Sequence, residues 1–322
     1  MLLVSIFIAT LFLAYVNGAN DNFKGVATLF GSRTASYQTA ILWATLTTFA
    51  GALTSTFLTS KSVREFSGQG ILDDAIAHAP EFHIAVVIAT ALTVLIATLL
   101  GLPVSTFHSL IAAIFGAALV AIGLKANFTV LASSFLVPLF ISAVLAIPLA
   151  AATYSFVEYI NSRFHLQPSQ KFIKIFHYFS AGIINFTRGF IHTSELVTLI
   201  VIIDYFSIAG AMITIAMAMA LGGLLNSQKV AETMSLKITP INPIQGLSAN
   251  IITSILVIAA SIFQLPVSIT YVAVGAIFGV GITTHQANKL VCSKILLAWI
   301  LSIPIATIIS GIIYRILQGS NT

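Results

Sequence analysis

The chain has 322 residues, of which 58% are hydrophobic and only 7% are charged, and its formal net charge is +5. A soluble domain carries roughly a quarter charged residues, so this composition excludes a water-facing surface and indicates an integral protein of the lipid bilayer. The basic residues are scattered singly between apolar runs, which excludes nucleic acid as a partner, and the lone Cys292 excludes a disulfide framework.

Ten apolar segments can be traced along the chain. At about 1.5 Å of rise per residue, a helix formed by each segment is long enough to be a candidate membrane segment. The alternating pattern of a membrane β-barrel is absent from the sequence, so we expect an all-α integral membrane protein. The first segment leads into a polar motif and lacks a basic leader, so we predict a retained helix rather than a signal peptide. The segments are 2–30, 37–59, 82–100, 105–124, 128–157, 176–203, 207–225, 246–263, 267–284 and 291–317.

The first segment ends in the polar motif "NGANDNFKG", which contains Asn20, Asp21 and Lys24. A carboxylate in the hydrocarbon layer costs roughly 3 kcal/mol even on the lenient insertion scale. One interpretation is an internal ion pair, because Asp21 and Lys24 are i and i+3 on one helix face. The other is a ligand site, because Gly18 and Gly25 permit an unwound segment whose backbone groups need a ligand, water or an ion.

A second motif, Leu-Pro-Val-Ser, occurs in "GLPVSTFHS" (101–109) and again in "QLPVSITYV" (264–272). Proline ends whatever precedes it, and Ser105 and Ser268 are suitable N-caps for the next helix. Such a helix start offers unpaired N–H groups and hydroxyls to an anion, and an ordinary turn between helices is the alternative. Re-entrant hairpins would bring both turns together near the midplane, whereas full crossings would put them at opposite faces. The segment lengths allow both.

The two halves of the chain repeat each other in the same order. A shift of 163 places "LPVSTFH" over "LPVSITY", and a shift of 164 places "GANDNFKG" over "GIINFTRG". The second shift pairs Asp21 with Asn185 and Lys24 with Arg188. The repeat therefore keeps a cation while it turns the acid into an amide.

We predict two five-segment repeats, 1–157 and 176–322, joined by a cytoplasmic linker loop at 158–175. Five is an odd number, so the second half enters the membrane from the opposite side. With the amino terminus outside, eight Lys and Arg residues are cytoplasmic and four are external, which obeys the positive-inside rule. The external four are Lys61, Arg64, Lys125 and Arg315. Inverted repeats are typical of secondary transporters, with the site between the halves.

Three further residues are candidates for local roles. His108 follows the first turn, and Tyr271 replaces it in the second half, so a role as hydrogen-bond donor or pH-sensitive group is open. His192 and Glu195 are i and i+3; they form a buried pair, or Glu195 replaces the acid lost at Asn185. No Gly-rich nucleotide loop, nucleophile elbow or HExxH motif is present in the sequence, so an enzyme or a primary pump is unsupported.

These motifs, with "ITPINPIQGLSANIITS", resemble the inorganic phosphate transporter (PiT) family over nearly the whole chain. The resemblance implies uptake of phosphate coupled to sodium or protons, without another cofactor, by an inverted-repeat protein that is usually a homodimer. Some relatives carry sulfate instead. The main departure is "GIIN", where Ile184 and Asn185 replace the family's amide and acid. One carboxylate rather than two favours fewer sodium ions, or a proton.

We therefore expect a secondary active transporter for inorganic phosphate in the cell membrane. A sulfate permease, a passive anion channel and a non-transporting scaffold are the alternatives. The expected ligands of the coupling cation are Asp21, Asn20 and Asn185. The expected substrate-binding residues are Asn20, Lys24, Ser105, Thr106, His108, Arg188, Ser268 and Thr270.

Overall fold

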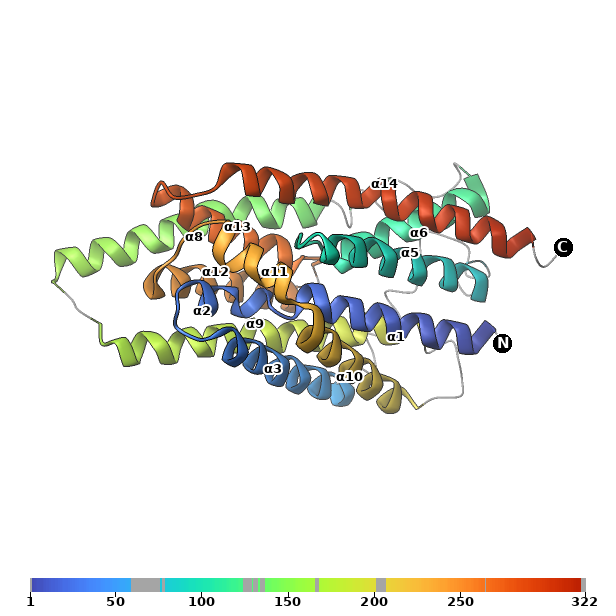
Figure 1. Ribbon diagram of the computed structural model, residues 1–322, viewed down its shortest axis with the longest axis horizontal. Coiled ribbons are helices and arrows are strands. Elements are labelled where there is room, and N and C mark those ends of the chain that lie inside the picture. The colour runs from blue at the N-terminus through green and yellow to red at the C-terminus, as the bar shows by residue number, and fades with distance from the viewer. Residues whose placement is uncertain are drawn as a thin grey trace.

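The computed structural model of the chain describes residues 2–58, 79–123, 137–165, 168–200, 207–263 and 265–319, with the single residues 76, 129 and 133. Every regular element that it assigns there is helical (Figure 1). The first half contains α1 (Leu2–Asp21), η1 (Lys24–Val26), α2 (Ala27–Gly31), α3 (Tyr37–Leu58), α5 (Pro80–Leu99), α6 (Thr106–Ile122) and α8 (Val137–Arg163). The second half contains α9 (Gln170–Thr198), α10 (Ile208–Asn226), α11 (Gln228–Glu232), η5 (Thr233–Lys237), α12 (Pro243–Ile262), α13 (Ile269–Thr283) and α14 (Lys289–Gly319).

Six helical stretches among the described residues are long and apolar enough to cross a membrane. They are Val4–Gly31, which includes α1, η1 and α2, and the helices α5, α8, α10, α12 and α14. Large apolar side chains cover the outside of the bundle; Ile8, Val144 and Ile312 are 61%, 65% and 55% exposed. Lipid covers such a surface without the penalty that water imposes, so the chain is a multi-pass integral protein of the cell membrane.

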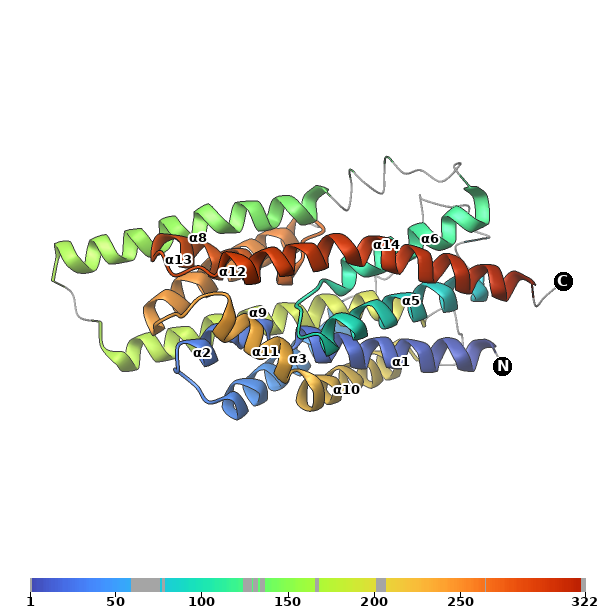
Figure 2. The same cartoon turned by 45° about the horizontal axis from the view of Figure 1, so that its top comes forward.

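The long helices run along the long axis of the molecule, and both termini lie at one end of it (Figure 1). α8 ends and α9 begins at the opposite end, and α14 begins on that side of the molecule (Figure 1). In both views α5 and α6 lie toward the end with the termini, and α12 and α13 lie toward the other end (Figure 2). α1 packs on α5 and α10, α9 packs on α12 and α3, and α6 and α13 pack on α14 and α8 respectively.

Glycines allow two pairs of these helices to approach to backbone contact. A Cβ atom on Gly18 of α1 would lie 1.9 Å from the carbonyl oxygen of Met219 in α10. A Cβ atom on Gly189 of α9 would lie 1.9 Å from the carbonyl oxygen of Thr48 in α3. Close approach at small residues is a common device for packing helices in membranes, where no hydrophobic force drives them together.

The connection between the two halves is shorter than the predicted loop at 158–175. α8 continues to Arg163, and α9 begins at Gln170 after the N-cap Ser169. The Ser169 hydroxyl accepts a hydrogen bond from the backbone N–H of Phe172 at 3.2 Å. Both helices therefore extend beyond the apolar stretches that marked them, because polar residues continue a helix once it has formed.

Five of the eight bases predicted to be cytoplasmic belong to the last turn of α8 or the first turns of α9 and α14, which lie toward the end of the molecule opposite the termini (Figure 1). They are Arg163, Lys171, Lys174, Lys289 and Lys294. Of the four bases predicted to be external, Lys61, Arg64 and Lys125 lie outside the described residues.

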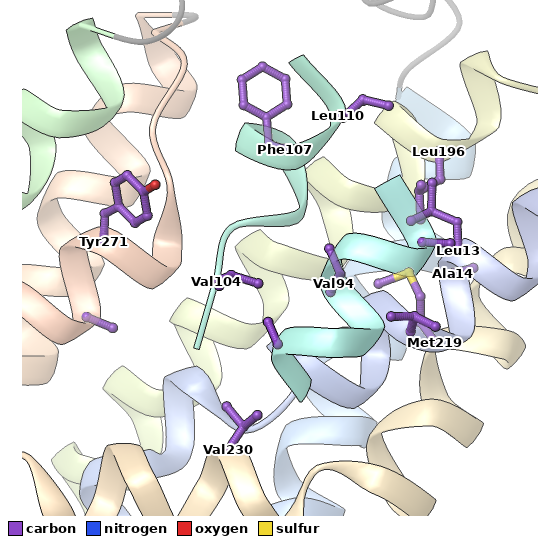
Figure 3. Close-up of a cluster of buried hydrophobic side chains, with 14 of the residues drawn as sticks. Leu13, Ala14, Val94, Val104, Phe107, Leu110, Leu196, Met219, Val230 and Tyr271 are labelled. Atoms are coloured by element: carbon purple, nitrogen blue, oxygen red, sulfur yellow. The ribbon is translucent and has the colours of Figure 1, made fainter. Parts of the chain in front are cut away.

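Buried apolar side chains pack where α1, α5, α6 and the segment before α6 meet. Figure 3 shows Val104 and Phe107 on one side of this core, Val94 at its centre, and Leu13 with Met219 on the other side. None of these five side chains is more than 4% exposed. The core holds the 101–105 turn rigidly against the end of α1, where the polar residues gather.

Candidate functional site

The first polar cluster lies at the point where α1 ends. Asp21 is the last residue of α1, a turn follows, and η1 begins at Lys24. Both side chains are buried, at 2% and 1% exposure. The Lys24 ammonium forms an ion pair with Asp21 Oδ1, donates to the Val104 carbonyl oxygen at 2.6 Å and also donates to Thr270 Oγ1. The predicted helix break and the predicted ion pair are both present.

The two Pro-Val-Ser turns meet at this cluster. Thr270 Oγ1 at the start of α13 donates to the Val104 carbonyl oxygen at 3.1 Å. Tyr271, the residue after Thr270, forms a second contact between the motifs: its hydroxyl is hydrogen-bonded to Nδ1 of His108 in α6. The equivalent motifs of the two halves therefore face each other.

Asn20 holds the first turn in place. Its amide Nδ2 donates to Thr98 Oγ1 at 2.9 Å and to the Leu102 carbonyl oxygen at 3.1 Å, and its Oδ1 accepts from the Val104 N–H at 3.1 Å. All of these partners belong to the α5–α6 hairpin. Asn20 is thus engaged in positioning the Val104 carbonyl that Lys24 contacts.

Ser105 and Ser268 are the N-caps of α6 and α13, as predicted. The Ser105 hydroxyl accepts from the His108 N–H at 3.2 Å, and the Ser268 hydroxyl accepts from the Tyr271 N–H at 3.4 Å. Each hydroxyl satisfies one N–H of a helix start. Thr106, the next residue, instead donates to Asp21 Oδ2 at 3.2 Å.

Arg188 brings a second cation into the cluster from α9. Its side chain is fully buried, and its Nη2 donates to Asn17 Oδ1 at 2.8 Å. Its Nη1 donates to Asn22 Oδ1 at 3.2 Å and Thr48 Oγ1 at 3.3 Å. Within the described residues it has no carboxylate at ion-pair distance, and its Nε has no hydrogen-bond partner. A buried guanidinium with neutral partners and a spare N–H is a suitable anchor for an anion.

Asn17 links Arg188 to Asp21, the partner of Lys24, although no role for Asn17 was predicted from the sequence. Its Nδ2 donates to Asp21 Oδ2 and to Thr106 Oγ1, both at 3.0 Å, while its Oδ1 accepts from Arg188. A spacing of four from Asp21, which puts both residues on one helix face, was the signal that could have identified it.

His192 and Glu195 form a partly buried pair on α9; a buried pair was one of the two expected alternatives. His192 Nδ1 lies 2.8 Å from Glu195 Oε2, and its Nε2 lies 3.8 Å from Asp21 Oδ2. The imidazole therefore stands between the carboxylates of the two halves.

A single shift in residue number relates the contacts of α1 and α10 to those of α9 and α3. Gly18 contacts Met219, and Gly189 contacts Thr48. Adding 171 to the number of Gly18 gives Gly189, and adding 171 to the number of Thr48 gives Met219. In both contacts a Cβ atom on the glycine would lie 1.9 Å from the carbonyl oxygen of its partner. Three contacts follow this rule. They are Gly18–Met219 with Gly189–Thr48, Gly222–Tyr15 with Gly51–Phe186, and Asn22–Thr48 with Thr193–Met219.

This shift changes the counterpart of Asp21. It pairs Asp21 with His192 and Lys24 with Glu195, and each half then has an i, i+3 acid–base contact in the opposite order. The shift of 164 drawn from the motifs, which pairs Asp21 with Asn185, differs from this contact shift by seven residues and stays a prediction.

Asn185 lies beside Gly25 instead. A Cβ atom on Gly25 would lie 2.8 Å from Asn185 Oδ1, and Asn185 makes no hydrogen bond to Asp21. Its amide is fully buried, and neither polar atom has a hydrogen-bond partner among the described residues. Buried amides are rarely left unsatisfied, so this position is a candidate for a bound ion or water; its role as a cation ligand stays a prediction.

Comparisons with known proteins cover nearly all of the chain. It is 26% identical to a "Probable low-affinity inorganic phosphate transporter" of Bacillus subtilis, over 99% of this chain and 98% of that protein. A protein of the same description from Rhizobium meliloti is also 26% identical, over 97% and 96% of the two chains. The solved structure titled "The sodium-dependent phosphate transporter" shares the fold, with a TM-score of 0.71 and 22% identity over 98% of this chain and 99% of that one. The sequence profile of the Phosphate transporter family matches residues 17–310, so this chain belongs to that family.

Proposed function

We propose that this protein is a secondary active transporter that carries inorganic phosphate through the site between its two halves. The observation that carries the proposal is Arg188, a fully buried guanidinium whose hydrogen-bond partners among the described residues are all neutral and whose Nε–H has no partner there. A charge in this position is costly unless an anion offsets it. Family membership and the names of the relatives indicate that the anion is phosphate.

The neighbouring groups suit a tetrahedral oxyanion. The Nε–H of Arg188 can donate a charge-assisted hydrogen bond to an oxyanion oxygen, and Lys24 adds a second positive charge close by. Thr106 and Thr270 supply hydroxyls, and His108 carries a buried Nε2 without a partner among the described residues. Ser105 and Ser268 act through the helix starts that they cap.

Alternating access is the second part of the proposal. The packing of α1 on α5 and α10 has its counterpart in the packing of α9 on α12 and α3, which supports repeats at 1–157 and 176–322. The meeting of the two turns supports re-entrant hairpins. Rocking of one set of elements against the other would then expose the site to each side in turn.

Cation coupling is the third part. Moving one negative charge inward against a membrane potential costs about 2.3 kcal/mol per 100 mV, so accumulation needs a co-moving cation. Sodium or a proton would serve, and the solved neighbour is titled sodium-dependent. A homodimer is expected from the resemblance and stays a prediction.

The test is labelled phosphate uptake into proteoliposomes under an imposed sodium or pH gradient, with sulfate as competitor. We expect accumulation that one of the gradients drives and that excess sulfate does not abolish. Uptake that ignores both gradients would identify a passive channel. Accumulation of sulfate alone would identify a sulfate permease. Absence of flux of both anions would favour a non-transporting scaffold.

A further inference from the structure

We propose that Lys24 is a tethered cation that fills the oxygen site at Asp21, where a sodium ion would otherwise bind. Phosphate transport by this protein is then independent of sodium at this site, and removing the ammonium creates a sodium site. The transport part rests on the proposed function, whereas the binding part does not.

The surroundings of the Lys24 ammonium are those of a monovalent metal cation. Its three contacts are oxygens: a carboxylate from α1, a backbone carbonyl from the 101–105 turn and a hydroxyl from α13. Unwound backbone carbonyls and carboxylates are the ligands that membrane transporters use for sodium. The oxygens lie close together, because Thr270 Oγ1 is 3.1 Å from the Val104 oxygen.

The ammonium and a sodium ion cannot share this site. Lys24 is 1% exposed and Asp21 is 2% exposed, so water cannot screen one cation from another. Two unit charges about 4 Å apart at an effective dielectric constant near 20 repel enough to lower sodium affinity by roughly a thousandfold. All three contacts hold the Lys24 ammonium at this site, where η1 begins after the end of α1.

The second half offers no free carboxylate for a replacement sodium ion within the described cluster. The counterpart of Asp21 is His192, and the counterpart of Lys24 is Glu195, which His192 contacts at 2.8 Å. The other cation beside Asp21 is Arg188, which reaches it through Asn17. Each carboxylate of this cluster thus has a nitrogen base of the protein itself as its partner.

The binding test uses the purified full-length protein in detergent. Binding of radioactive sodium is measured directly, and the thermal unfolding midpoint in sodium chloride is compared with that in choline chloride. Lys24→Met keeps the length of the side chain and removes the charge. Lys229→Met is the matched control, since the exposed Lys229 ammonium also donates to a backbone carbonyl, that of Leu99 at 3.0 Å. Asp21→Asn combined with Lys24→Met removes both the cation and the carboxylate.

We expect saturable sodium binding only in Lys24→Met, with an unfolding midpoint that rises with sodium and not with choline, because a ligand stabilises the state that binds it. Saturable sodium binding to the wild type at the affinity of Lys24→Met would overturn the proposal. So would a folded Lys24→Met that binds no sodium. If Lys24→Met does not fold, Lys24→Gln, which keeps a donor for the Val104 carbonyl, is measured in its place, and the same two results would overturn the proposal.

The transport test replaces sodium by choline on both sides of wild-type proteoliposomes. We expect the phosphate flux to change by less than about twofold, since a tenfold change would need about 1.4 kcal/mol of sodium binding that this site does not provide. A tenfold loss of flux in choline would overturn the tethered-cation proposal and leave phosphate transport standing. Absence of phosphate flux in every condition would overturn the transport function and leave the binding result intact.

Discussion

At the scale of single residues, Asn17 determines how the charges of the site are connected. Its amide donates to Asp21 and Thr106 and accepts from Arg188, so one neutral side chain joins the acid of α1 to the base of α9. Polar networks of this kind in a low dielectric are strong when every member is satisfied. Among the described residues the Nε–H of Arg188 has no partner, and we propose that the substrate completes the network there.

Replacing Arg188 by Gln tests this assignment. Hydrogen bonds to charged groups contribute about 1.5–3 kcal/mol, so we expect phosphate affinity to fall by roughly 10–150-fold. The measurement is labelled phosphate binding and the KM of uptake. Arg315→Gln is the control, because Arg315 is an exposed arginine at the far end of α14. Unchanged phosphate affinity in Arg188→Gln would contradict its role as the anion anchor.

Replacing Asp21 by Asn leaves the buried Lys24 ammonium without its carboxylate. Breaking a buried ion pair from one side costs about 3–5 kcal/mol, so we expect a clear fall in unfolding midpoint and loss of phosphate accumulation. The additional change Lys24→Met should restore much of the stability and none of the accumulation. Full phosphate accumulation by the Asp21→Asn variant would contradict the assignment of Asp21 to the transport site.

At the scale of the helices, close glycine contacts fix the register in which the two halves pack. α1 lies on α10 through Gly18, and α9 lies on α3 through Gly189, each with backbone in contact with backbone. A helix pair held in this way cannot slide by a turn without a clash. The polar side chains of α1 and α9 therefore meet in one register only, with His192 opposite Asp21.

Gly18→Ala should separate α1 from α10. The added Cβ atom would lie 1.9 Å from the Met219 oxygen, and overpacking of this kind costs about 1–3 kcal/mol. We expect a lower unfolding midpoint in detergent and weaker phosphate binding, because Asn17 and Asp21 move with α1. Gly319→Ala is the control, since a Cβ atom there meets nothing within 4 Å. Equal midpoints for the two variants would show that the contact does not constrain the helices.

At the scale of the whole molecule, the two ends differ in charge and in the elements they carry. The termini and the α5–α6 hairpin lie at one end, and the α8–α9 connection with its basic residues lies at the other (Figures 1 and 2). Because basic residues are retained in the cytoplasm, the end with the termini should face outward.

Single cysteines in a Cys292→Ser background test this orientation. We expect an impermeant maleimide to label Gly319→Cys in intact cells and Ser169→Cys only after permeabilisation, because both positions are exposed and lie at opposite ends. The background variant should take no label. Labelling of Ser169→Cys in intact cells would reverse the predicted topology.

The sequence determined the class, the apolar segments and the charged residues of the site, but not the part played by Asn17. Burial in lipid leaves a direct record in composition, so the segment predicted at 105–124 differs little from α6 at Thr106–Ile122. Proline and serine specify helix ends locally, so both N-caps followed from sequence. Asp21 and Lys24 stood out because charges are expensive in a membrane.

Only the tertiary structure decided which residues face each other. Shifts of 164 and 171 differ by seven residues, which is about two turns of a helix and keeps every side chain on nearly the same face. The likeness of "GANDNFKG" to "GIINFTRG" favoured the shift of 164, and nothing in the sequence pointed to the shift of 171. The backbone contacts at Gly18 and Gly189 follow the shift of 171, and only the folded structure reveals them, because they join helices far apart in the chain.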